Sequence, residues 1–149
     1  MARQPDSGLY ENFLRRDGRL NRWRYFKRIT LLAVVETLIA MVVFIMNMNA
    51  LGQLSSSGET VFKLLLAVGQ IPFLCLMIRR LHDCDKDEKL AYVSLALNAL
   101  TIILTDYKTL AEPSSFENAV TIFAGLIGLY VLLCPGTHGE NQYGEDPLE

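Results

Sequence analysis

The sequence carries little charge, and what it carries is nearly balanced. Charged residues make up 20% of its 149 residues, hydrophobic residues make up 51%, and the net charge at pH 7 is −2. A soluble domain usually has about a quarter of its residues charged. Proteins that bind nucleic acid are usually basic overall, so this balance argues against a nucleic-acid partner.

Cysteine and histidine are scarce as well. The three cysteines, Cys75, Cys84 and Cys134, follow no disulfide pattern, and we expect all three to be reduced thiols. Cys84 and Cys134, together with His82 and His138, would offer thiolate and imidazole ligands to zinc. Their H-x-C and C-x3-H spacings are not those of a zinc finger. We therefore predict no metal site and no cofactor, with zinc as the alternative.

Long apolar runs are what the sequence has in abundance. Four of them, residues 29–48, 61–78, 90–105 and 119–134, contain few charges. About twenty apolar residues form a helix that crosses the hydrocarbon core of a bilayer. A soluble helix would instead show a charged face, whereas the first run contains Glu36 as its single charge. We predict an all-α integral membrane protein with four transmembrane helices in an antiparallel bundle. The third run is short and could also be tilted or partly interfacial.

Lysine and arginine are distributed unevenly between the segments that flank these runs. Twelve of them precede the first run or separate the second from the third, and only two, Lys63 and Lys108, lie on the other side. The positive-inside rule therefore predicts that both termini are cytoplasmic. The chain then consists of a basic amphipathic approach segment (1–28), a four-span membrane domain (29–134) and a Gly/Pro-rich acidic tail (135–149).

The approach segment contains the residues that we expect to meet the membrane surface. Gly18 can adopt the left-handed conformation that ends a helix, and Asn21 is a candidate N-cap for the next one. Aromatic rings and basic groups then alternate, which is typical of the headgroup region. We expect anionic lipid headgroups to contact this stretch, or the stretch to serve only as an anchor. Its residues are Trp23, Arg24, Tyr25, Lys27 and Arg28.

Three polar stretches, each beside an apolar run, occur in a recognisable order. They are "DGRLNRWRYFKR" (17–28), "IRRLHD" (78–83) and "PGTHGENQYGEDP" (135–147). Together they resemble the bacterial inner-membrane family called domain-of-unknown-function 805, over about residues 13–147. The resemblance implies a multi-pass protein of the bacterial inner membrane but no activity. The chain departs from the family at 84–92, "CDKDEKLAY", where relatives usually have a stretch rich in glycine, serine and tryptophan.

All three stretches fall on the predicted cytoplasmic side, where they can form a cap. The tail cannot extend the fourth helix and is expected to fold back as a loop. Its acidic groups and Asn141 would find donors in Arg19, Arg79 and Arg80. His82 and Asp83 are adjacent in sequence and do not face each other on a helix, so we predict no catalytic site. The cap residues, with structural or interaction roles, are Gly18, Arg19, Arg22, Arg79, Arg80, His82, Asp83, Asn141, Tyr143 and Asp146.

Polar residues within the apolar runs are the remaining candidates. Ionisable groups in the hydrocarbon are costly and often functional, which singles out Glu36. It could accept hydrogen bonds from the basic residues that follow the second run, or stay protonated. Gln70 and Asn98 are expected to bond between helices, whereas Gly125 and Gly128 would permit close packing.

The leading functional prediction is a non-enzymatic membrane protein, a scaffold that binds lipid or another membrane protein through the cytoplasmic cap. The alternative is a small proton-coupled transporter or channel subunit that works as a homo-oligomer and uses Glu36. Small multidrug-resistance transporters also have four spans and one carboxylate in the first. An enzyme that acts at the inner leaflet through His82 and Asp83 is a third possibility.

Overall fold

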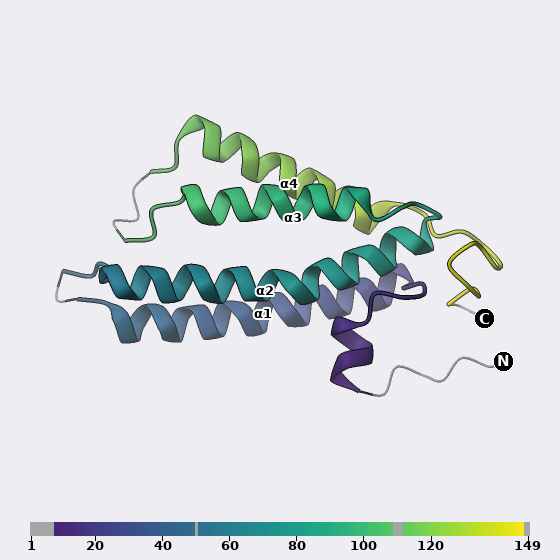
Figure 1. Ribbon diagram of the computed structural model, residues 1–149, viewed down its shortest axis with the longest axis horizontal. Coiled ribbons are helices and arrows are strands. Elements are labelled where there is room, and N and C mark those ends of the chain that lie inside the picture. Colours follow the sequence, from purple (N-terminus) through teal and green to yellow (C-terminus); the bar gives the residue numbers. More distant parts are fainter. Residues whose placement is uncertain (1–7, 50, 109–111, 148–149) are drawn as a thin grey trace.

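A computed structural model describes residues 8–49, 51–108 and 112–147. These residues form four long helices after a short π-helical turn, and they contain no strand beyond two isolated bridges. The elements are η1 (Tyr10–Leu14), α1 (Arg22–Asn47), α2 (Ser56–Asp83), α3 (Lys89–Leu104) and α4 (Ser115–Leu133), as Figure 1 shows. The all-α prediction is confirmed. The approach segment before residue 8 and the tail after residue 147 lie outside the described residues.

Polar caps start the three longest helices several residues before the apolar runs begin. The side chain of Asn21 accepts from the backbone N–H of Arg24 at 2.8 Å, as predicted. Ser55 caps α2 in the same way, and Ser114 forms a capping box with Glu117 at the start of α4. At its other end α2 continues through residues 79–83, because nothing in that stretch breaks a helix. The predicted cap residues of the second stretch are therefore helical.

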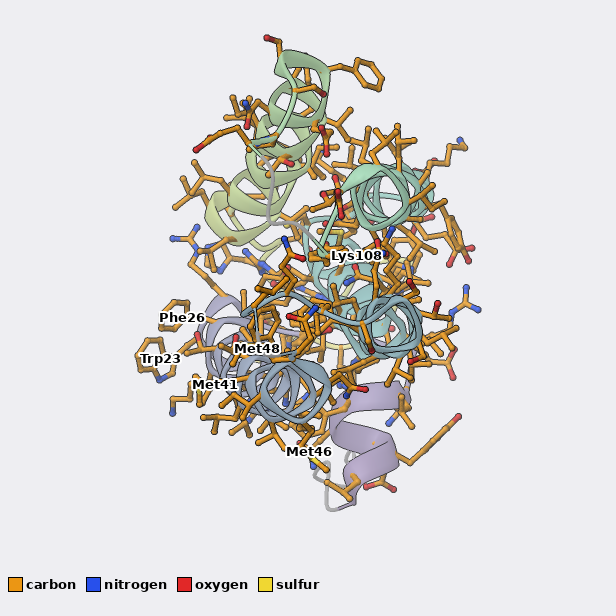
Figure 2. All side chains as sticks on the ribbon, turned by 90° about the vertical axis from the view of Figure 1, so that its left-hand side faces the viewer. Trp23, Phe26, Met41, Met46, Met48 and Lys108 are labelled. Atoms are coloured by element: carbon orange, nitrogen blue, oxygen red, sulfur yellow. The ribbon has the colours of Figure 1, made fainter. Side chains whose placement is uncertain are left out.

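Three of the helices are long and apolar enough to cross a membrane. These are α1, α2 and α4, whereas α3 has 16 residues and is shorter. Many of their large apolar side chains are exposed, and Figure 2 shows that Trp23 and Phe26 project outward from α1. An apolar surface of this extent is unfavourable in water and suggests a membrane protein. That all four helices cross a bilayer stays a prediction.

The helices pair as two antiparallel hairpins, α1–α2 and α3–α4. Packing is most extensive within each hairpin, α2 and α3 join the two, and α1 and α4 make few contacts. Figure 1 shows the hairpins close together where α2 leads into α3 and farther apart toward the opposite end. The buried apolar cluster lies at the end where the two hairpins are close together. It contains Leu20, Tyr25, Leu76, Ile78, Leu81, Ala91 and Val131. The fold is therefore firmly packed at one end.

Candidate functional site

Asp83 lies at the centre of the firmly packed end, in the last turn of α2. Its Oδ1 is 3.2 Å from Nε of Arg19, and its Oδ2 pairs with Nη1 of Arg80. The three side chains are at most 4% exposed. Arg80 and Asp83 are three residues apart on α2 and so face each other, whereas Arg19 arrives from the segment before α1. One carboxylate thus ties the approach segment to α2.

The other N–H groups of these arginines donate to backbone carbonyls. Arg19 donates to the carbonyls of Thr137 and Gly139 in the tail. Arg80 donates from Nε to Val131 at 3.2 Å and from Nη2 to Cys134. The last carbonyls of a helix lack partners within the helix, so Arg80 completes the C-terminal end of α4 and opposes its negative pole.

Arg22 and Arg79 add two further links. Arg22 Nη2 donates to the carbonyl of Leu133 at 2.7 Å, which is also at the end of α4. Arg79 is 1% exposed and points away from Arg80, because neighbouring helical residues lie about 100° apart. Its Nη1 donates to the carbonyl of Glu11 in η1 at 2.9 Å. The two consecutive arginines therefore hold different parts of the chain.

The tail folds back over the end of α2, as predicted. The backbone N–H of Thr137 donates to the carbonyl of Asp83 at 2.8 Å, and Asn141 Nδ2 donates to that of His82 at 2.9 Å. The ring of Tyr143 stacks on His82 with centroids 3.9 Å apart. Asn141 thus donates to the backbone of α2, whereas it had been expected to accept from an arginine.

Two more of the predicted residues fix the turns of this region. Gly18 has φ +78°, the left-handed conformation that the sequence suggested, and its carbonyl oxygen lies 3.3 Å from His82 Nδ1. A carbonyl only accepts, so Nδ1 is the nitrogen that carries the proton. Asp146 Oδ2 accepts from the backbone N–H of Gly139 at 3.0 Å. We call the assembly of Arg19, Arg79, Arg80, Asp83 and tail residues 135–147 the arginine cap.

The potential zinc ligands do not form a site, although the side chains of Cys84 and Cys134 interact. Cys84 Sγ lies 3.8 Å from the carbonyl oxygen of Cys134, and burial raises the pKa of the Cys84 thiol to about 12. A protonated thiol is a poor metal ligand. Within residues 8–49, 51–108 and 112–147, no three His, Cys, Asp or Glu side chains are placed to hold a metal ion. The geometry gives no support to the zinc alternative.

The residues predicted to meet lipid divide into two groups. Trp23, Arg24 and Lys27 are exposed, and Lys27 Nζ lies 5.0 Å from the centre of the Trp23 ring. Tyr25 is only 3% exposed and belongs to the buried cluster, so its assignment to the lipid interface was wrong. Its position lies about 200° around the helix from Trp23, which turns it inward. Arg28 binds Asn12 Oδ1 in η1 instead of facing outward alone.

A pocket of about 490 Å³ lies between the two hairpins. Its wall includes all three polar residues singled out within the apolar runs: Glu36 from α1, Gln70 from α2 and Asn98 from α3. In the direction of the chain, α1 and α3 run away from the arginine cap, and α2 and α4 run toward it. The three polar residues therefore line the part of the pocket farthest from the cap, which we call its deep end. Tyr25 and Leu132 line the end nearest the cap. The pocket is therefore polar at its deep end and largely apolar along its length.

Glu36 has no internal partner for one of its oxygens. Its Oε1 is buried and receives no hydrogen bond from the described residues. The predicted donors Arg79 and Arg80 are engaged in the arginine cap. The amide nitrogens of Gln70 and Asn98 donate to carbonyls of their own helices, at 3.5 Å to Leu66 and 2.8 Å to Ser94, and not between helices.

A close approach of backbone makes room for this carboxyl group. A methyl group at Gly69 of α2 would overlap Oε1 of Glu36, so the glycine lets the carboxyl group lie against the backbone of α2 in its present position. Gly128 was expected to allow close helix packing, but a methyl group there would meet nothing within 4 Å. It lines the pocket instead. Gly69 thus leaves room for the Glu36 carboxyl group, whereas Gly128 borders the pocket without a close neighbour.

Comparison with known proteins shows where this arrangement belongs. The sequence model of a family described as "Protein of unknown function (DUF805)" matches residues 13–145. The chain belongs to the DUF805 family. No curated protein and no solved structure matches it.

The matched range of this DUF805 protein contains the whole pocket and nearly all of the arginine cap. Sequence reasoning found the cap residues but did not assemble the pocket. Tyr25, Ser94 and Met77 were missed as lining residues. The sequence feature that could have predicted the pocket is that Glu36 and Asn98 lie at similar positions in two apolar runs that both start at the cap.

Proposed function

We propose that this DUF805 protein is a non-enzymatic, multi-pass protein of the bacterial inner membrane that binds an amphiphilic, lipid-like molecule between its two hairpins. In this proposal all four helices cross the bilayer and both termini are cytoplasmic. The apolar surfaces of α1, α2 and α4 and the segregation of basic residues support that placement. The exposed Trp23, Arg24 and Lys27 would then meet anionic headgroups.

The observation that carries the proposal is the pocket. Ligand sites typically have volumes of about 300–1,000 Å³, mostly apolar walls and a few converging polar groups. The pocket has about 490 Å³, and polar side chains from three helices line it. A buried carboxyl oxygen without a donor is costly unless a ligand or a proton satisfies it. These features favour binding over a purely structural role.

The arginine cap supports binding by holding the pocket walls together. The guanidinium groups of Arg19 and Arg80 are buried and already donate to Asp83 and to backbone carbonyls. A macromolecular partner would have to replace these bonds in order to use the same groups. We therefore assign the cap a structural role and place ligand binding in the pocket. Binding of a membrane-protein partner or a second copy stays a proposal without geometric support.

The test is to fill the pocket and ask which molecules still copurify. Gly128→Phe places a ring in the pocket, and Gly125→Phe adds the same ring to the same helix at an exposed position outside it. Both proteins are purified in a non-ionic detergent, and bound amphiphiles are counted by native mass spectrometry. We expect wild-type protein and Gly125→Phe to retain a bound species and Gly128→Phe to lose it. Equal retention by all three proteins would contradict the proposal.

Proton-coupled transport of the same molecule is the second candidate. The specific observation in its favour is that the unpartnered carboxyl group of Glu36 lies in the pocket and away from the cap. A carboxyl group at such a position can bind either a proton or a cationic ligand. Transport requires binding first, so this candidate extends the binding proposal.

A further inference from the structure

We infer that the molecule bound in the pocket carries a primary amine, and that its ammonium group pairs with Glu36. The inference rests on the proposed function, because it names the chemical class of the ligand in the same site. Its first basis is the charge of the wall. Glu36 is the acidic residue of the pocket, and the residues that line it include no Lys, Arg or His. An ionised Glu36 therefore gives the pocket a negative potential that nothing in its wall offsets.

Basic residues elsewhere on α1 and α2 have partners of their own. Arg28, eight residues before Glu36 on α1, donates to Asn12 Oδ1. Arg80 is paired with Asp83 in the arginine cap, and Arg79 donates to Glu11. Lys63, near the opposite end of α2, has its Nζ 2.9 Å from a carboxylate oxygen of Glu59. A buried carboxylate without a counter-ion is strongly unfavourable, whereas one that gains a hydrogen-bonded cation is not. The ligand is the source of that cation.

The other polar groups at the deep end match an ammonium group better than other cations. Because the amide nitrogens of Gln70 and Asn98 donate within their own helices, their side-chain oxygens are the groups left to accept from a ligand. With Glu36 they provide three acceptors from three helices. A primary ammonium has three donors and no acceptor. A quaternary ammonium has no donor and would leave the two amide oxygens without partners.

The rest of the pocket defines the body of the ligand. Glu36 and Tyr25 both line the pocket and are eleven residues apart on α1, which corresponds to about 16 Å. The wall along this length is mostly apolar, with Phe73, Met77 and Leu132 among its residues. An unbranched or narrow apolar body fits this shape. An anionic phospholipid does not, because its phosphate would face the Glu36 carboxylate.

The experiment compares three probes that share one alkyl chain: dodecylamine, dodecanol and dodecanoic acid. Each is titrated at neutral pH into the full-length protein in a non-ionic detergent, and bound molecules are counted by native mass spectrometry. The proteins are wild type, Glu36→Gln, Gly128→Phe and Gly125→Phe. Each probe is compared between variants, so that differences in partitioning into the detergent cancel. Circular dichroism of the helices verifies that every variant is folded.

We expect Glu36→Gln to weaken binding of the amine at least about tenfold while binding of the alcohol changes little. Gly128→Phe should weaken binding of both probes, and Gly125→Phe should weaken neither. If Glu36→Gln binds the amine as well as wild type does, the amine inference is wrong, although binding lost in Gly128→Phe would still support the proposed function. If no probe distinguishes Gly128→Phe from Gly125→Phe, both proposals are wrong. Weaker binding of dodecanoic acid to Glu36→Gln than to wild type, by as large a factor as for the amine, would also overturn the inference.

Discussion

The substitution Asp83→Asn tests whether the ion pairs of Asp83 with Arg19 and Arg80 stabilise the fold strongly because they are buried. It keeps the size of the side chain and removes the charge that faces Arg19 and Arg80. Loss of one partner from a buried ion pair costs about 3–5 kcal/mol. Both arginines keep their backbone acceptors, so we expect the lower end, about 3 kcal/mol. For a chain of this size that loss lowers the melting temperature by about 6–12 °C.

The chain provides a matched control in Glu88→Gln. Arg16 and Glu88 have the same 3.2 Å separation between nitrogen and oxygen as Arg19 and Asp83, but their side chains are 50% and 44% exposed. An exposed pair contributes about 0–1 kcal/mol, so this substitution should change the melting temperature little.

Three buried cysteines provide the assay. Thermal unfolding in a non-ionic detergent is monitored through the reaction of the cysteines with a thiol-specific reagent at each temperature. The labelled sites are identified by mass spectrometry. Cys84 and Cys134 adjoin the cap, whereas Cys75 lies two turns back in α2. Asp83→Asn should expose Cys84 and Cys134 at a lower temperature than Cys75. A melting temperature as high as that of Glu88→Gln would refute the reasoning.

Two further predictions concern the tail and the pocket. A methyl group at Gly136 would overlap Oδ2 of Asp83, a side chain that two arginines hold in place, so Gly136→Ala should lower the free energy of unfolding by about 1–3 kcal/mol. A methyl group at Gly125 meets nothing within 4 Å, so Gly125→Ala should lower it much less. Equal melting temperatures of the two variants would contradict this. If the protein couples transport to protons, vesicles that contain it and a pH-sensitive dye should show an amphiphile-dependent proton flux that Glu36→Gln abolishes. Binding without such a flux would reject transport and leave the binding proposal intact.

The features that the sequence predicted well are those that depend on local chemistry. The apolar runs are too long for ordinary strands and form helices. Asn21 caps α1 through a bond to its own helix three residues on. The meeting of the three polar stretches followed from hairpin connectivity, since each stretch comes at the same end of a hairpin. The pairing of Arg80 with Asp83 was not predicted, because the arginines were expected to pair with the acidic groups of the tail.

The features that the sequence did not predict depend on the rotation of each helix about its axis. A soluble helix reveals its buried face through an apolar stripe, but helices that are apolar all round give no such signal. Tyr25 was therefore assigned to the lipid side although it is buried, and Gly128 was assigned to a helix contact although it lines the pocket. Nothing in the sequence distinguished Arg79 from Arg80, but in the structure Arg79 binds Glu11 and Arg80 binds Asp83.

The two regions of this DUF805 protein are mechanically related. One wall of the pocket belongs to α1 and α2 and the other to α3 and α4, so its width depends on how the hairpins are held. Away from the cap, α1 and α4 make few contacts, and the buried apolar cluster lies at the cap end. Arg80 joins the end of α2 to the end of α4 across the two hairpins. We therefore propose that the arginine cap sets the spacing of the pocket walls, so that residues outside the pocket would influence which ligands it can accept.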